Sequence, residues 1–598
     1  MLQPKDTINA YFSSSQNQPQ SLTEIDHIVF GIGSSLNSWP ARRDYVKLWW
    51  DTQKMRGCVF VDSPLSSLEN NTDSHLLPPI CVSEDTSRFR YTWAGGDRNA
   101  IRIARCVLET VRMFNASADE VRWYVFGDDD TIFIPENLAR TLSKYDHRSW
   151  YYIGATSEIY HQNWLFGDDM AFGGVGVALS SSLANVLAKN FDSCIERYPH
   201  LYGGDARIHA CVLELGVGLS HEPGFHQFDV NGNALGILTS HPTRPLVSLH
   251  HMSHIDPLFP NSNTFSAIQH LFAAVELDPL RIFQLSVCYD RRYSWTISVS
   301  WGYTVQIESG HMFLRDVLRT QQTFRPWQNF GGLASVYTFN TREFNPDPCK
   351  RPVTFFMEHV SSSTPDDGTI KSVYKQAYEN CTYDPISSPR KIEEVRVFST
   401  RFDPDIRKFD LNGNALGILT SHSTRPLVSL HHMSHLDPLF PNSTTFSAVQ
   451  HLFSAVELDP LRILQLSVCY DRRYSWTISV SWGYTVQIES RHMFVRDVLR
   501  TQQTFRPWQN FGGLASVYTF NTREFNPDPC KRPVTFFMEY VSSDPGDGTI
   551  KSVYKQAYEN CTYDPISSPR KIEEIRVFST RLDPDIRQVI EGSEKTVL

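Results

Sequence analysis

The chain has 598 residues and a formal net charge of -9, a length that as a prior suggests about three or four domains. A hydrophobic content of 41% with 13% aromatic residues is ample for packed cores and argues against wholesale disorder. The negative charge and the lack of a long Lys/Arg run argue against a nucleic-acid partner, and no apolar run approaches the roughly 18 residues of a membrane span.

The first part of the chain alternates short apolar runs with helical patterns. Residues 1–25 begin with a polar, Gln- and Ser-rich stretch, which predicts a flexible segment without a signal peptide. Strands are expected at residues 27–33, 57–62 and 121–126, and helices at 99–114 and, after Pro135, at 136–145. This alternation predicts an α/β domain over residues 26–260 with a largely parallel sheet.

Three adjacent carboxylates, Asp128, Asp129 and Asp130, directly follow the strand predicted at 121–126. Neighbouring carboxylates repel one another, which a bound divalent cation such as Mn²⁺ or Mg²⁺ relieves. The carboxyl end of a strand is also where α/β sheets bind ligands. The alternative is a solvated acidic turn or a helix cap, but the apolar flanks favour a site.

A glycine run and a further aspartate follow in the chain. Gly173 and Gly174 lack a Cβ and permit close approach of the backbone to a ligand, or they form a turn before a helix expected at 180–189. The pair Asp168-Asp169 is expected to be solvated surface. Asp205 precedes a helix predicted at 206–215, where it is either functional or the N-cap.

The second part of the chain contains an internal duplication. Residues 228–407 reappear, nearly unchanged, as residues 409–587, a repeat far too long for a solenoid. Alternating patterns at 293–307, 352–358 and 394–398 predict strands. We therefore expect a mostly β accessory module at 261–407, a second copy of the repeat unit at 408–587 and a tail at 588–598.

Several segments in order resemble the Fringe-related, family 31 glycosyltransferases, in particular their plant branch of unknown acceptor. They are residues 27–32 (HIVFGI), 47–50 (KLWW), 123–130 (WYVFGDDD), 152–154 (YIG), 171–176 (AFGGVG), 201–205 (LYGGD) and 249–252 (LHHM). The resemblance implies a GT-A nucleotide-sugar fold (Rossmann-like), a UDP-sugar donor, Mn²⁺ or Mg²⁺, and inversion at the anomeric carbon.

The resemblance also implies roles for single residues. Asp128 and Asp130 match the family's DxD motif, with Asp130 the direct metal ligand, while Asp129 contributes to the cofactor site from between them. Gly173 and Gly174 match the loop beside the sugars. His250 matches the third metal ligand, with His251 the alternative, and the second copy repeats this segment at 430–433.

The catalytic base departs from the family's pattern. The family has an acidic pair where this chain has Asp205 followed by Ala206, so Asp205 is the expected base. An inverting transfer from a UDP-sugar to a glycan or glycoprotein hydroxyl is the expected function, and the alternative is a degenerate transferase that binds a sugar nucleotide or glycan without turnover. The family implies the Golgi lumen or membrane, although the chain shows no anchor.

Overall fold

The protein was analysed as a computed structural model. The structure describes residues 22–401 except 65–73, 115–119, 168, 241–244, 329–336, 363–368, 380 and 382–387, four positions within 452–458, and residues 466–580 except 472–475, 492, 494–496, 499, 506–521, 545–548, 558–560 and 562–567. Most of the segment expected at 1–25, the tail at 588–598, Asp168 and the second copy's 430–433 motif lie outside these residues. Among the described helices, none is long and apolar enough to cross a membrane.

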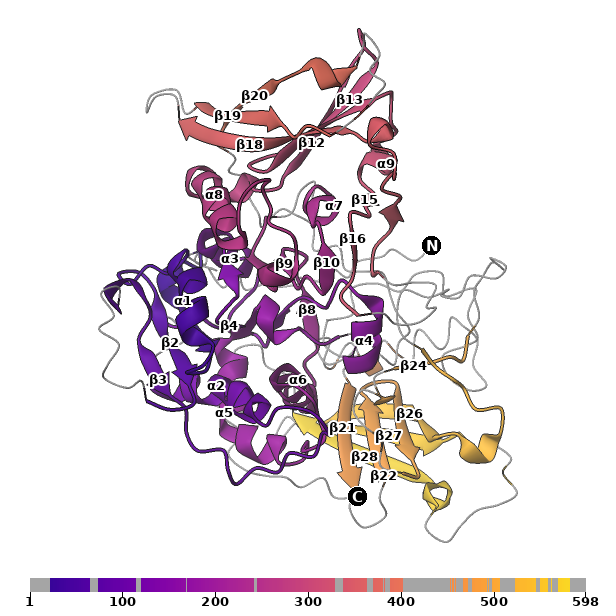
Figure 1. Ribbon diagram of the computed structural model, residues 1–598. Coiled ribbons are helices and arrows are strands. Elements are labelled where there is room, and N and C mark those ends of the chain that lie inside the picture. The colour runs from indigo at the N-terminus through magenta and orange to yellow at the C-terminus, as the bar shows by residue number, and fades with distance from the viewer. Residues whose placement is uncertain are drawn as a thin grey trace, which may run out of the picture.

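A seven-stranded sheet forms the centre of the first half of the chain (Figure 1). Its strands, in spatial order, are β3 (Ile80–Val82), β2 (Arg56–Val61), β1 (Ile28–Gly33), β4 (Trp123–Asp128), β7 (Val177–Ser180), β6 (Tyr152–Gly154) and β8 (Leu219–His221). The helices of this half are α1 (Trp39–Lys47), α2 (Asn99–Met113), α3 (Pro135–Leu142), α4 (Tyr160–Phe166), α5 (Ser181–Ile195) and α6 (Gly204–Glu214). The apolar face of α2, which its sequence spacing predicted, packs against α5, α6 and the sheet.

The sheet is mixed, because β7 runs antiparallel to both β4 and β6, whereas the other neighbouring pairs are parallel. The alternative expectation for Gly173 and Gly174, a turn directly before a helix, was wrong in one respect, because a strand lies between the turn and the helix. Gly173–Val175 forms a 3-10 turn, and β7 follows before α5 begins at Ser181. The predicted mixed α/β class is confirmed in this coarse form.

Smaller sheets connect the two halves of the chain. A three-stranded sheet orders β5 (Ile132–Phe133), β11 (Ser248–Leu249) and β9 (Phe225–His226). Strand β10 (Val230–Gly232) pairs with β16 (Phe324–Pro326). The Asn137 side chain on α3 donates to the carbonyls of Leu246 and Pro279 at 2.8 and 2.7 Å. Because β10 and β11 belong to the first repeat copy, this copy is built into the α/β region.

The first copy continues as a helix, α8 (Thr264–Leu277), followed by a six-stranded antiparallel sheet. The sheet orders β12 (Leu285–Asp290), β13 (Trp295–Ser300), β14 (Thr304–Ser309), β18 (Val353–Ser362), β19 (Thr369–Gln376) and β20 (Glu394–Thr400). One hydrophobic cluster runs without interruption from Ile28 on β1 to Tyr374 on β19. The first half of the chain and the first copy therefore share a core.

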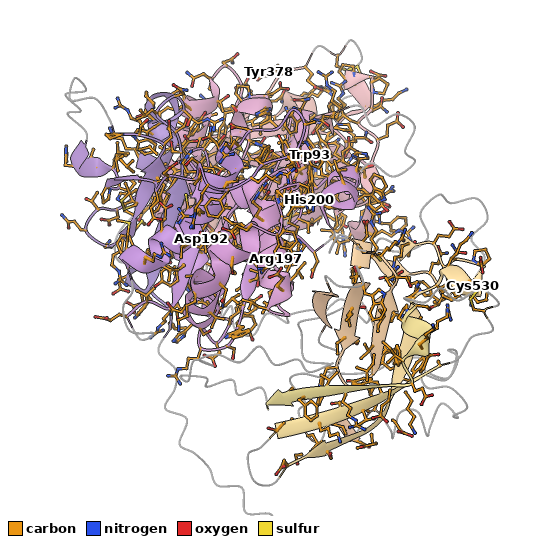
Figure 2. All side chains as sticks on the ribbon, turned by 90° about the horizontal axis from the view of Figure 1, so that it is seen from below. Trp93, Asp192, Arg197, His200, Tyr378 and Cys530 are labelled. Carbon is orange, nitrogen blue, oxygen red and sulfur yellow. A yellow bond between two sulfur atoms is a disulfide. The ribbon has the colours of Figure 1, made fainter. Side chains whose placement is uncertain are left out.

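The second copy forms an equivalent sheet with a separate hydrophobic cluster (Figures 1 and 2). It orders β21 (Leu466–Asp471), β22 (Trp476–Ser481), β23 (Thr485–Glu489), β26 (Val534–Ser543), β27 (Thr549–Gln556) and β28 (Glu574–Thr580). The disulfide Cys349–Cys381 of the first copy recurs as Cys530–Cys561. The expected β-rich unit is thus present twice. In the second copy, Arg500 donates to the Trp164 carbonyl on α4 at 2.9 Å.

Candidate functional site

The aspartate run lies in a tight turn at the carboxyl end of β4. Asp128 is the last residue of that strand, and its backbone N–H donates to the Thr131 hydroxyl at 2.8 Å. The same hydroxyl donates to the Gly174 carbonyl at 2.6 Å. Thr131 therefore fixes the acidic turn against the glycine turn that precedes β7.

Asp128, Asp130 and His250 converge, as the sequence predicted. In the described part of the chain they form a group whose ligand atoms all lie within 4.8 Å of one another. His250 Nε2 lies 3.2 Å from Asp130 Oδ1 and 3.8 Å from Asp128 Oδ2. The Asp130 Oδ1 atom is buried and accepts no hydrogen bond of good geometry, as expected of an oxygen that faces a cation site.

The orientation of His250 is set by Gln227. The Asp229 carboxylate can only accept hydrogen bonds, so it faces the Gln227 amide nitrogen, at 3.3 Å. The Gln227 Oε1 atom then lies 3.1 Å from His250 Nδ1 and accepts its proton. The Nε2 lone pair consequently points at the two carboxylates. Three lone-pair donors facing one another suit a divalent cation, and a hydrogen-bonded imidazole of this kind is typical of metal ligands.

The electrostatics of the group are those of crowded carboxylates. Burial, together with repulsion from Asp130, Asp129 and Asp205, raises the pKa of Asp128 well above its usual value. Burial alone would also raise the pKa of Asp130, but the adjacent His250 imidazole and the Arg42 guanidinium favour the ionised carboxylate and lower this pKa to about 2. Burial lowers the pKa of His250.

Asp129 lies apart from this group. Its Oδ2 accepts from the hydroxyls of Ser34 and Ser38 at 2.7 and 2.6 Å, and its Oδ1 accepts from Arg42 at 2.9 Å. Arg42 also lies 3.4 Å from Asp130 Oδ2. Both Asp129 oxygens are therefore engaged by protein donors, which anchors the acidic turn against α1 and the residues before it.

Gly174 lies directly against the His250 ring. A Cβ on Gly174 would stand 2.1 Å from His250 Cε1 and 2.4 Å from Nε2, so no other residue fits here without moving the imidazole. His251, the alternative ligand, turns the other way: its Nδ1 lies 3.3 Å from Asp229 Oδ1 and its ring packs on that of His250 at 3.8 Å. The structure thus favours His250 over His251.

Asp205 lies in the first turn of α6, whose N-cap is Gly203, so the reading of Asp205 as N-cap was wrong. Its carboxylate accepts from the backbone N–H groups of Ala206 at 2.8 Å and Gly173 at 3.4 Å. Burial raises its pKa above the usual value. Ala206 is 8% exposed and belongs to the hydrophobic core, so this position faces inward.

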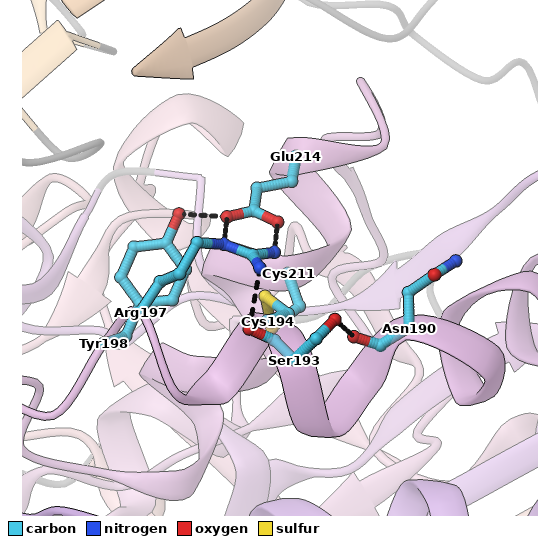
Figure 3. Close-up of a disulfide and its surroundings, with 7 residues drawn as sticks. All are labelled: Asn190, Ser193, Cys194, Arg197, Tyr198, Cys211 and Glu214. Carbon is cyan, nitrogen blue, oxygen red and sulfur yellow. Dashed lines mark hydrogen bonds and ion pairs between the residues drawn. A yellow bond between two sulfur atoms is a disulfide. The ribbon is translucent and has the colours of Figure 1, made fainter. Parts of the chain in front are cut away.

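The helix that carries Asp205 is braced at its far end (Figure 3). A disulfide joins Cys194 on α5 to Cys211 on α6, and Arg197 pairs with both carboxylate oxygens of Glu214. The Tyr198 hydroxyl donates to the same carboxylate at 2.7 Å. These contacts hold α6 against α5. Asp169, which was expected to be solvated surface, is half-buried, and its carboxylate accepts from the Leu219 N–H at 3.2 Å.

Sequence reasoning missed four residues of the site: Gln227, Ser34, Ser38 and Arg42. None of them has a distinctive sequence pattern. Their partners lie between 23 and 95 positions away in the chain, so only the folded structure reveals them.

The sequence was compared with protein families and with curated proteins. No curated protein matches the chain at a significant level. One family model, described as "Protein of unknown function, DUF604", matches residues 162–408 and again residues 400–593. The first match contains the glycine turn, Asp205 and His250, and the second corresponds to the repeated copy. Since the two matches together span more than half of the sequence, the chain belongs to the DUF604 family.

Proposed function

We propose that the protein is an inverting glycosyltransferase that transfers a sugar from a UDP-sugar to a hydroxyl of a glycan or glycoprotein. The observation that carries this proposal is the convergence of Asp128, Asp130 and the Nε2 lone pair of His250 at the end of β4. A Fringe-related, family 31 protein with a GT-A fold would have a metal-binding triad of this composition, which supports the resemblance of the sequence motifs.

The triad would hold Mn²⁺ or Mg²⁺. When bound there, the cation would supply Lewis-acid neutralisation of the diphosphate. The residues of the chain prepare the site: Gln227 orients His250, Gly174 leaves room for its ring, and Thr131 fixes the acidic turn. Arg42 adds positive charge beside Asp130.

Asp205 would be the base of the reaction. The acceptor hydroxyl gives its proton to an Asp205 carboxylate oxygen while its own oxygen bonds to the anomeric carbon. The bond from that carbon to the diphosphate oxygen breaks, and UDP leaves. A carboxylate with a raised pKa suits proton acceptance near neutral pH. The Gly173 N–H holds one Asp205 oxygen beside the glycine turn.

A second candidate is a degenerate transferase that binds a sugar nucleotide without turnover. Ala206 favours it, because the family's second acidic position is here a buried methyl group. For either candidate we propose the Golgi lumen as the location. Four disulfides support an oxidising secretory compartment.

The deciding experiment measures UDP release from a panel of UDP-sugars with and without Mn²⁺, alongside calorimetry of UDP binding. We expect Mn²⁺-dependent release with at least one donor, and a loss of about 100-fold or more in Asp130→Asn. The matched control is Asp316→Asn, a half-exposed aspartate of the first copy, which should behave as the parent. UDP binding without release would favour the second candidate, and neither binding nor release would refute both.

A further inference from the structure

An aromatic patch lies on the surface beside Asp205. It consists of Trp93, Phe166 and Tyr202. The ring centroids of Trp93 and Tyr202 are 5.8 Å apart, as are those of Phe166 and Tyr202. Tyr202 is 48% exposed, although it stands at the centre of the group. Figure 2 labels Trp93 in a view from below. Large aromatic side chains that remain exposed in a cluster indicate a binding surface.

The loop that carries Tyr202 is held rigidly from beneath. The fully buried Arg207 donates to the carbonyls of Leu201 and Gly203, each at 2.8 Å. The Tyr91 hydroxyl donates to the Tyr202 carbonyl at 3.0 Å. The Thr92 N–H donates to the Pro199 carbonyl at 2.8 Å, so the loop carrying Trp93 is tied to the loop carrying Tyr202. Burying a guanidinium beneath a loop costs free energy, and its hydrogen bonds to the loop carbonyls give the rigid support that a binding site requires.

The patch is continuous with the candidate active site. Tyr202 stands three residues before Asp205, at the entry to α6. On the other side, the ring of Phe166 packs on that of Phe172 at 6.3 Å, and Phe172 directly precedes Gly173, whose N–H donates to Asp205. A ligand lying on the patch is therefore adjacent to the carboxylate that would accept a proton.

We propose that the aromatic patch binds a sugar ring of the acceptor. This inference rests on the proposed function and identifies the surface on which the acceptor substrate would bind. A pyranose ring presents C–H groups on its face and hydroxyls around its edge, so its face stacks on aromatic rings while a hydroxyl reaches outward. The three side chains of the patch are all aromatic, as stacking on the face of a sugar ring requires. Rigid aromatic side chains also lose little conformational entropy when they bind a ligand.

The test uses the full chain and four variants on an array of galactose-, glucose-, xylose- and N-acetylglucosamine-terminated glycans. Trp93→Ala and Tyr202→Ala should weaken glycan capture at least tenfold, whereas Tyr202→Phe, which keeps the ring, should retain it. The matched control is Tyr378→Ala, which removes a tyrosine that is 72% exposed on the first copy. Circular dichroism verifies that each variant is folded.

The possible results separate this inference from the proposed function. The inference is overturned if the parent captures no glycan, if the two alanine variants capture glycans as the parent does, or if the parent captures only peptides from a control array. Calorimetry of the parent with Mn²⁺ and UDP runs in parallel. UDP binding without glycan capture would overturn the inference alone. If the parent captures glycans and the alanine variants do not, but the parent binds no UDP, the glycan-binding role of the patch is supported and the proposed transferase function is refuted.

Discussion

Replacing Gly174 by alanine provides a sharp test of the metal site, because the added methyl group would overlap the His250 ring. The added Cβ would stand 2.1 Å from His250 Cε1, whereas ordinary contact begins at 3.4 Å. The imidazole must therefore move by about 1.3 Å, since the Thr131 hydroxyl holds the Gly174 carbonyl and limits movement of the backbone. A ligand displaced by about 1 Å can reduce function roughly 100-fold.

We expect Gly174→Ala to weaken Mn²⁺ binding by about 10- to 100-fold. Losses of this size are typical when a residue that orients a metal ligand is mutated. Isothermal titration calorimetry with Mn²⁺ in the presence of UDP measures the affinity. Gly173→Ala is the matched control one residue earlier, because its Cβ would meet its nearest atom, Asp205 Cβ, at an ordinary 3.4 Å. If both variants bind Mn²⁺ as the parent does, His250 is not a ligand and the argument fails.

Three further predictions concern single residues. Gln227→Leu should lower Mn²⁺ affinity by about 10-fold or more, because His250 Nδ1 loses its acceptor; unchanged calorimetry would contradict this. Burial raises the pKa of Glu109 to about 7 from an ordinary 4.5, so its protonated form favours folding, and this stabilisation is lost as the pH rises from 4.5 through 7. Urea unfolding from pH 4.5 to 8 should therefore show the parent losing stability relative to Glu109→Gln as the pH rises, and parallel profiles would disprove it. Ala206→Asp should give no gain in sugar transfer and a lower melting temperature, since it buries a carboxyl group; a gain in transfer would show that the natural chain is impaired.

The sequence predicted those parts of the site that follow from local patterns. The apolar run before Asp128 identified β4, and the motif resemblance brought His250 to the aspartates from 120 positions away along the chain. No comparable pattern marks Gln227, because a lone glutamine before a strand is ordinary and its role depends on its contact with the His250 ring. The same holds for the two serines and the arginine that engage Asp129.

The misread elements have physical causes. Strand β7 is four residues long and runs directly into α5, so a pattern this short did not stand out between the glycine run and the helix expected at 180–189. Its antiparallel direction depends on the chain returning beside β4, which local periodicity does not encode. Asp205 resembled an N-cap because aspartate is common there, but α6 begins at Gly204, two residues before the expected start, with Gly203 as its N-cap.

The shared core of the first copy has a consequence for how the protein reaches its native state. Both copies carry nearly the same apolar face, yet one cluster joins the first copy to β1 and β4 while the second copy closes its own. During folding the two compete for one place, and misassembly of this kind is characteristic of repeated domains.

The order of synthesis resolves that competition. At about 5–20 residues per second, the first copy leaves the ribosome roughly 10–35 s before the second, because the repeat spans about 180 residues. The first copy can then dock on the α/β region before the second copy has been synthesised. In a chain refolded from denaturant both copies are present from the start, and we expect a mixture in which the second copy occupies the place of the first in a fraction of molecules.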